Sequence, residues 1–167
     1  MAEFDLFVDT LLDVNEGSEY VPDDCGRGPS KWGITLETYR QWDPGATADT
    51  IRDMTRDGAA YFYRCQFGWE PLHMPAIHSQ AVAEKVFDLQ VNTGRGVVFL
   101  QQAANVTPDG RIGPVTLAAV NAIPPDEMLK RIYAAGKAYY DSVVAAHPDR
   151  QRLYVGWMAR LAKGIPI

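Results

Sequence analysis

Glu16 is the residue best placed for chemistry, because it is acidic and lies at the predicted end of a helix. Apolar residues recur at three- and four-residue spacing over residues 3–16, which predicts an amphipathic helix, and Gly17 is suited to end it. The helix dipole and partial burial should both raise the pKa of Glu16. A carboxylic acid that keeps its proton near neutral pH can protonate a glycosidic oxygen. By position alone, an ordinary surface glutamate in a fraying last turn is the simpler interpretation.

The rest of the chain predicts further helices and one irregular segment. Residues 17–34 are rich in Gly, Pro, Asp and Ser, which indicates a long loop or a small β-hairpin. Thr35 can cap a short helix that runs to Trp42, and a longer helix is predicted from about Thr50 to Phe67. The remaining predicted helices span residues 76–92, 96–105, 114–122, 125–146 and 149–162. In the first of these, the side chains expected to face inward are Ala81, Val82, Val86, Phe87 and Leu89.

Composition limits the possible functions. The chain has 167 residues, of which 47% are hydrophobic, enough for one sizeable core. Its net charge of -5 argues against a nucleic-acid binder, since such proteins need a basic surface. From Lys130 onward, however, seven Lys or Arg face two Asp, and this basic end could contact an anionic polymer or simply be a solvated helix surface. His73, His78 and His147 match no metal-ligand spacing, so we expect neither a metal nor a cofactor.

Several motifs together resemble one enzyme family. Glu16-Gly17, Gly28, Ser30 and Trp32-Gly33-Ile34-Thr35 follow the order of the catalytic segment in glycoside hydrolase family 108, phage-type N-acetylmuramidases related to lysozyme. Residues 87–94, 100–103 and 109–117 are similar to the helical peptidoglycan-binding-type region of that family. The resemblance implies a mainly helical, lysozyme-like fold with a hairpin or long loop after the first helix. It also implies a catalytic lobe over residues 1–75 and a peptidoglycan-binding-type lobe over residues 76–167, packed as one compact unit.

The same resemblance makes Glu16 the expected general acid but leaves its partner open. Cys25 stands where the family usually has an aspartate, with Asp24 one residue earlier and Ser30 at the position of a threonine. Asp24 could hold the attacking water, or Cys25 could orient it, or Glu16 could act alone. Asp23 becomes a further candidate if the loop shifts.

Three residues are candidates for binding sugar. Tyr20 and Trp32 flank the expected cleft and could stack on sugar faces, although Trp32 could equally pack beneath the hairpin. Asn92 could bind an acetamido group, or it could simply end its helix before Gly94.

The resemblance implies a muramidase that cleaves the β-1,4 bond between N-acetylmuramic acid and N-acetylglucosamine. Two alternatives remain: a lytic transglycosylase in which Glu16 is both acid and base, and a wall-binding protein without activity. The expected partner is peptidoglycan, and the expected form is a monomer. The N-terminus lacks the cationic start of a secretory signal, so we expect synthesis in the cytoplasm and release to the wall by a holin or export route, as for an endolysin. Cys25 and Cys65 are expected to be free thiols.

Overall fold

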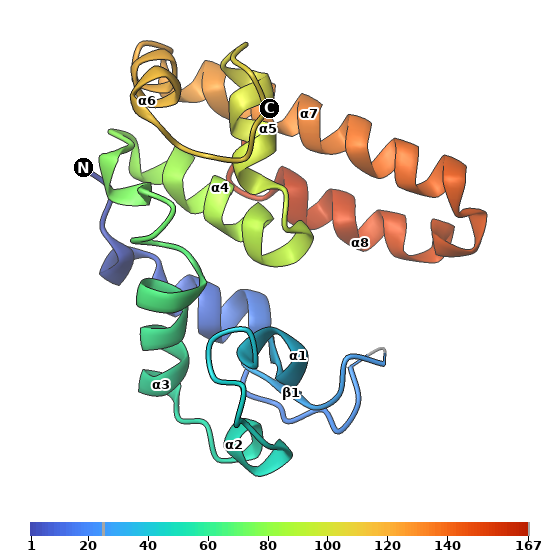
Figure 1. Ribbon diagram of the computed structural model, residues 1–167. Helices are drawn as coiled ribbons and strands as arrows, with labels where there is room; N and C mark the ends of the chain where they lie inside the picture. Colours follow the sequence, from blue (N-terminus) through green and yellow to red (C-terminus); the bar gives the residue numbers. More distant parts are fainter. Residues whose placement is uncertain (25, 167) are drawn as a thin grey trace. The chain divides into compact units, whose positions relative to one another are not determined.

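The computed structural model describes residues 1–24 and 26–166, which form two compact units (Figure 1). The N-terminal unit spans Glu3–Pro71, and the C-terminal unit comprises Met1–Ala2 and the chain from Leu72 onward. The structural boundary therefore lies slightly before the predicted boundary at residue 75.

The N-terminal unit contains short helices and one hairpin. Phe4–Leu6 is a 3-10 turn (η1), and Thr10–Glu16 is a π-helix (η2). The hairpin strands are Ser30–Lys31 (β1) and Ile34–Thr35 (β2). The helices that follow are α1 (Leu36–Tyr39), α2 (Ala48–Arg52), α3 (Arg56–Tyr61) and the π-helix η3 (Phe62–Phe67).

The helix predicted over residues 3–16 is present, but its second half is wound more widely than an α-helix. It ends at Gly17, as expected, and the Gly17 N–H donates to the carbonyl of Leu12, five residues back, at 2.7 Å. Leu11 and Leu12 are fully buried and anchor this segment in the core. π-Helical turns are rare and often occur at functional sites, and this one carries Glu16.

The irregular segment contains the small hairpin. Ser30 pairs with Thr35 and Lys31 with Ile34, antiparallel, and the turn consists of Trp32 and Gly33. Both turn residues have positive φ, 56° and 71°, as the tight two-residue turns of hairpins require. Thr35 caps α1 as predicted, since its hydroxyl accepts from the Thr38 N–H at 3.1 Å. That helix ends at Tyr39, before the predicted end at Trp42.

The single helix predicted from Thr50 to Phe67 is wrong. The chain leaves α2 at Asp53, and a new helix begins after Thr55, whose hydroxyl accepts from the Gly58 N–H at 3.1 Å. Because a Thr hydroxyl satisfies a free N–H at a helix start, Thr55 favours a break there. The last residues, Phe62–Phe67, again adopt the wide π-helical winding.

The C-terminal unit is a helical bundle. Its elements are η4 (Met74–Ala76), α4 (Gln80–Thr93), α5 (Gly96–Ala103), α6 (Pro114–Asn121), α7 (Pro125–Ala146), η5 (Pro148–Arg150) and α8 (Gln151–Ala162). Helix α4 packs on α5 and α7, and α7 packs on α5 and α8; Figure 1 shows α7 and α8 running side by side. Of the residues predicted to face inward from α4, four are buried, but Ala81 is exposed.

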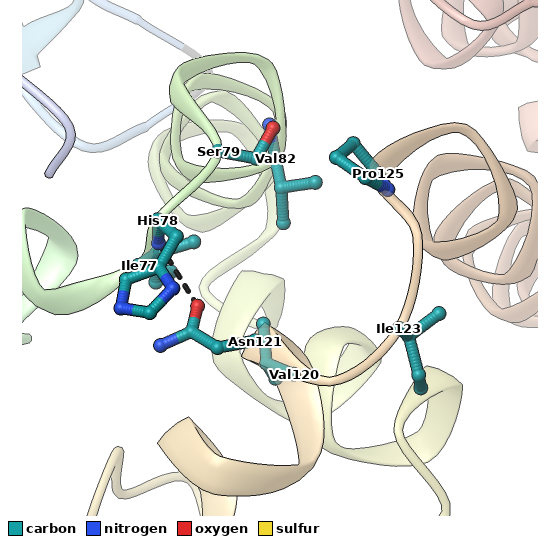
Figure 2. Close-up of a pocket in the computed structure, with 8 residues that line it drawn as sticks. All are labelled: Ile77, His78, Ser79, Val82, Val120, Asn121, Ile123 and Pro125. Carbon is teal, nitrogen blue, oxygen red and sulfur yellow. Dashed lines mark hydrogen bonds between the residues drawn. The ribbon is translucent and has the colours of Figure 1, made fainter.

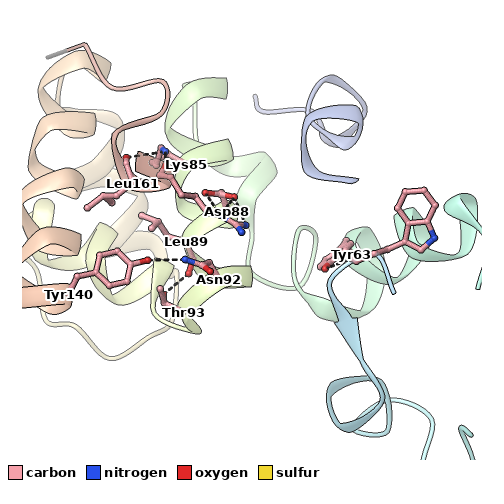
Figure 3. Close-up of polar contacts among 10 residues, drawn as sticks. Tyr63, Lys85, Asp88, Leu89, Asn92, Thr93, Tyr140 and Leu161 are labelled. Carbon is pink, nitrogen blue, oxygen red and sulfur yellow. Dashed lines mark hydrogen bonds and ion pairs between the residues drawn. The ribbon is translucent and has the colours of Figure 1, made fainter. Parts of the chain in front are cut away.

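Two buried polar networks stabilise this bundle. The Gln101 amide donates to Asp109 at 2.7 Å and accepts from the Gly110 N–H at 2.8 Å, which fixes the loop between α5 and α6. The Lys85 ammonium donates to the carbonyls of Arg160 and Leu161, near the end of α8, at 3.3 and 3.2 Å (Figure 3). Because the last carbonyls of a helix have no partner within it, Lys85 supplies a C-terminal cap. Among the described residues, no helix combines the length and apolar character needed to cross a bilayer.

Candidate active site

The Glu16 side chain lies directly against the hairpin turn. A β-carbon built on Gly33 would be 2.1 Å from Glu16 Oε2 and 2.7 Å from Cδ, so only glycine leaves room for this carboxylate. Glu16 is half-buried at the last position of η2. The structure thus joins Glu16-Gly17 and Gly33-Ile34-Thr35, the two motifs on which the sequence-based assignment rests.

One helical segment, α3 with η3, fixes both partners of this contact. Arg56 forms ion pairs with Asp9 at 2.5 Å and Asp13 at 2.8 Å, which lie on or beside the helix that carries Glu16. The hydrogen bond from Arg56 lowers the pKa of Asp13. The Tyr63 hydroxyl donates to the carbonyl of Trp32, in the hairpin turn, at 3.0 Å. Since Tyr63 is buried, this second link is protected from water.

The two loop aspartates have different surroundings. Asp23 Oδ1 accepts from the N–H groups of Gly26 and Gly28 at 3.1 and 3.2 Å, so its carboxylate shapes the loop. Asp24 uses its main chain in the loop, donating from its N–H to the Gly28 carbonyl at 2.8 Å. No hydrogen bond from a described residue engages the Asp24 carboxylate, which leaves Asp24 the better candidate for holding a water. Cys25 lies outside the described residues, and Cys65 is a free thiol.

The other predicted residues of this unit lie around the hairpin. Ser30 is buried, and its main chain bonds Val21 in both directions at 2.9 Å. Tyr20 is half-buried, with the Arg52 guanidinium 5.3 Å from its ring centre, so Arg52 covers one ring face. Trp32 is only 9% exposed, which favours the alternative in which it packs beneath the hairpin. Its indole N–H is buried without a hydrogen-bond partner among the described residues.

Asn92 belongs to the C-terminal unit, whereas Glu16 belongs to the N-terminal unit. The Asn92 side-chain N–H donates to the Tyr140 hydroxyl at 2.8 Å (Figure 3). Burial raises the pKa of Tyr140 to about 12, so Tyr140 stays neutral and can accept this bond. Asn92 therefore has a structural role, and its binding of an acetamido group stays a prediction.

The C-terminal unit also holds a pocket of about 320 Å³ between the start of α4 and the loop from α6 to α7 (Figure 2). Apolar side chains line it together with His78, Ser79 and Asn121, and the Asn121 side chain is engaged by the backbone. Asn121 accepts from the His78 N–H at 2.9 Å and donates to the Ala76 carbonyl at 3.1 Å. None of the predicted site residues lines this pocket. Among the described residues, no three His, Cys, Asp or Glu side chains group closely enough to hold a metal ion.

A half-buried glutamate at a helix end, set against a hairpin turn in a helical fold, is an arrangement suited to a glycoside hydrolase. Family comparison agrees: residues 9–94, over half of the chain, match the model for Glycosyl hydrolase 108. The protein belongs to this family and is a glycoside hydrolase. Residues 95–162 match a second model, described as a predicted peptidoglycan domain. Together the two matches support peptidoglycan as the substrate.

Comparison with solved structures supports the fold. The structure of SagA from Brucella abortus superposes with a TM-score of 0.81 at 24% sequence identity, covering 96% of this chain and 90% of that one. The predicted mainly helical, lysozyme-like fold with a small hairpin is thus confirmed. No curated protein matches the chain.

The boundary between the family models does not coincide with the structural one. The first model extends to residue 94 and includes α4, whereas the N-terminal unit ends at Pro71. Sequence reasoning also missed the roles of Tyr63 and Arg56 in positioning the site. Arg56 and Tyr63 are seven residues apart, about two helical turns, which places them on the same side of a helix. Nothing in the sequence indicated which distant residues they would contact.

Proposed function

We propose that the enzyme hydrolyses the β-1,4 bond between N-acetylmuramic acid and N-acetylglucosamine, with Glu16 as the general acid. The observation that carries the proposal is the contact of the Glu16 carboxylate with Gly33, within the segment that matches the glycosyl hydrolase model. Glu16 lies at the helix end, and its carboxylate is set against the hairpin turn. Its half-buried position also suits a group that must keep a proton until substrate arrives.

In the reaction, protonated Glu16 donates its proton to the glycosidic oxygen, and the bond from that oxygen to the anomeric carbon of N-acetylmuramic acid breaks. A water oxygen bonds to the anomeric carbon, and its proton passes to a base. General acid catalysis of this kind contributes roughly two to four powers of ten in rate.

Asp24 is the proposed base that holds this water. Its carboxylate is half-buried and is not committed to the loop, whereas that of Asp23 binds two N–H groups. The distance between the two carboxyl groups distinguishes inverting from retaining enzymes. The distance between the Glu16 and Asp24 carboxyl groups with substrate bound would therefore indicate whether the anomeric configuration is inverted or retained.

A lytic transglycosylase is the second candidate, because the Asp23 carboxylate is committed to the loop and Asp24 alone is left as a possible base. If neither loop aspartate acts, Glu16 alone transfers the proton in both directions, and the muramic acid 6-hydroxyl replaces water. Mass spectrometry of peptidoglycan digested by the pure protein separates the two reactions. We expect muropeptides that end in reducing N-acetylmuramic acid. Anhydromuramic ends would instead establish the transglycosylase.

A further inference from the structure

The C-terminal unit has a shallow groove of about 440 Å³ between α5 and α7. One wall consists of Arg95, Phe99 and Gln102, spaced four and three residues apart along one side of α5. The rest of the lining comes from one side of α7, from Ala135, Ala138, Tyr139 and Ser142. The groove exists because the lining residues of α5 face those of α7, and the alanine side chains on α7 are too small to fill the space between the two helices.

Two polar side chains of this groove, Arg95 and Gln102, are not committed to the fold, whereas the Ser142 hydroxyl donates to the Tyr139 carbonyl at 2.6 Å. The Arg95 guanidinium lies over the Tyr139 ring at 5.1 Å from its centre, and no described Asp or Glu pairs with it. The Gln102 side-chain amide likewise has no hydrogen-bond partner among the described residues. Phe99 also packs against Tyr139, with the two ring centres 5.5 Å apart. A fixed aromatic ring, a positive charge and an amide are thus available together.

The positive charge of Arg95 is not neutralised by the acid nearest to the groove. Asp141, the nearest acid along α7, is engaged elsewhere: it pairs with Lys137 at 2.7 Å and accepts a hydrogen bond from Tyr154. The Lys137 and Tyr154 hydrogen bonds lower the pKa of Asp141 and keep it ionised in that pairing. The Arg95 charge therefore remains available to a ligand.

We propose that this groove binds a carboxylate-bearing muropeptide, separately from the Glu16 site. Arg95 forms a charge-assisted hydrogen bond with a carboxylate of the stem peptide, and Tyr139 and Gln102 contact the adjoining sugar or peptide. Arginine suits this role because its planar fork matches a carboxylate. All of the lining residues fall within residues 95–162, which match the predicted peptidoglycan domain. The inference takes its ligand class from the proposed function but not its catalytic residue.

Direct titration with two soluble probes tests the proposal. The first is N-acetylglucosaminyl-N-acetylmuramyl-tetrapeptide, which carries stem carboxylates and lacks the bond that the enzyme is proposed to cleave. The second is diacetylchitobiose, a neutral sugar. NMR titration of the full chain should shift the backbone signals of the α5 and α7 groove residues with the first probe only. Equal shifts with chitobiose would overturn recognition of a carboxylate.

Matched variants locate the binding. Arg95→Gln should weaken muropeptide binding by about tenfold or more, the usual effect of losing a charge-assisted hydrogen bond. Arg152→Gln, an exposed position on α8, makes the same charge change outside the groove and should bind as wild type does. Ala138→Phe should block the groove, whereas Ala118→Phe, exposed on α6, should not. Wild-type binding by both groove variants, or equal losses in the controls, would contradict the proposal.

The outcomes also separate this inference from the proposed function. Glu16→Gln should bind the muropeptide as wild type does, because Glu16 lies in the other unit. An enzyme that hydrolyses peptidoglycan through Glu16 but shows no binding in the groove overturns the inference alone. A protein that binds in the groove but retains hydrolysis after Glu16→Gln overturns the catalytic assignment alone.

Discussion

The Glu16 carboxylate occupies the space that a side chain at Gly33 would need, with Oε2 only 2.1 Å from the position of a β-carbon there. Gly33 therefore has two requirements: a positive φ of 71° and the absence of a side chain. The turn conformation alone would make glycine favourable, but the contact makes it necessary for this position of Glu16.

Gly33→Ala should cost activity far beyond its cost in stability. The added methyl group must displace Glu16, and small misplacements of a catalytic group can cost about a hundredfold in rate. Strain from positive φ should add about 1–2 kcal/mol of destabilisation. Gly110→Ala is the matched control, since φ is 77° there but the nearest heavy atom to a β-carbon is 4.0 Å away. Equal kcat losses in the two variants would show that strain, and not Glu16 displacement, is responsible.

Tyr63→Phe should loosen the hairpin turn without removing a core ring. The variant keeps the buried ring but loses the 3.0 Å hydrogen bond to the Trp32 carbonyl. We expect a loss of about 1 kcal/mol in unfolding free energy. We also expect a fall of about three- to tenfold in kcat, with a smaller change in KM, because the turn contacts Glu16. Tyr61→Phe, at a neighbouring ring that is 55% exposed, should change neither quantity.

Asp24→Asn and Asp23→Asn separate a catalytic from a structural aspartate. If Asp24 holds the attacking water, its neutral amide should lower kcat by about a hundredfold while thermal stability stays unchanged. Asp23→Asn should keep most activity, because an amide oxygen can still accept from Gly26 and Gly28. Full activity in Asp24→Asn would favour the mechanism in which Glu16 acts alone.

Stability at high pH should depend on Tyr140. Burial raises its pKa to about 12 in the folded protein, whereas an unfolded tyrosine titrates near 10. Between these values only the unfolded chain releases the proton. The stabilisation by neutral Tyr140 is thus complete below about pH 10 and is lost as the pH rises towards 12, by about 2–3 kcal/mol in total.

Denaturant unfolding of wild type and Tyr140→Phe, from pH 8 to 11.5, measures this contribution. Burial lowers the pKa of Lys85, which acts in the opposite direction in this range, so the difference between the two proteins is the relevant quantity. The wild type should lose stability relative to Tyr140→Phe as the pH rises above about 10. A difference that is independent of pH would contradict the assignment.

Local signals in the sequence predicted the helices well where those signals were strong. Periodic apolar residues predicted residues 125–146 as a helix, and α7 has these bounds. Thr35 was identified as a cap from its residue type alone. The break at Thr55 was missed because a threonine within a helical pattern does not reveal whether its hydroxyl caps a new helix. The wide winding of η2 was missed because the apolar spacing of α- and π-turns is too similar over two turns.

The candidate site was predictable only in part. Helix-end position and motif order singled out Glu16, and Gly33 was part of the same motif order. The contact between Glu16 and Gly33 is long-range, as are the links from Arg56 and Tyr63, and no local pattern encodes such pairs. The burial of Trp32 depends on the same tertiary packing. From the sequence alone, the Trp32 ring was equally compatible with stacking on a sugar and with packing in the core.

The role of Glu16 is tested most directly by the release of reducing ends from purified peptidoglycan by Glu16→Gln. Glu19→Gln, at an exposed position three residues along, is the control for loss of a carboxylate in this segment. The account predicts that Glu16→Gln lowers the rate by about a hundredfold or more, with unchanged unfolding and retained peptidoglycan binding, while Glu19→Gln stays within about twofold of wild type. Retention of most activity by a folded Glu16→Gln protein would contradict the assignment of Glu16 as the general acid.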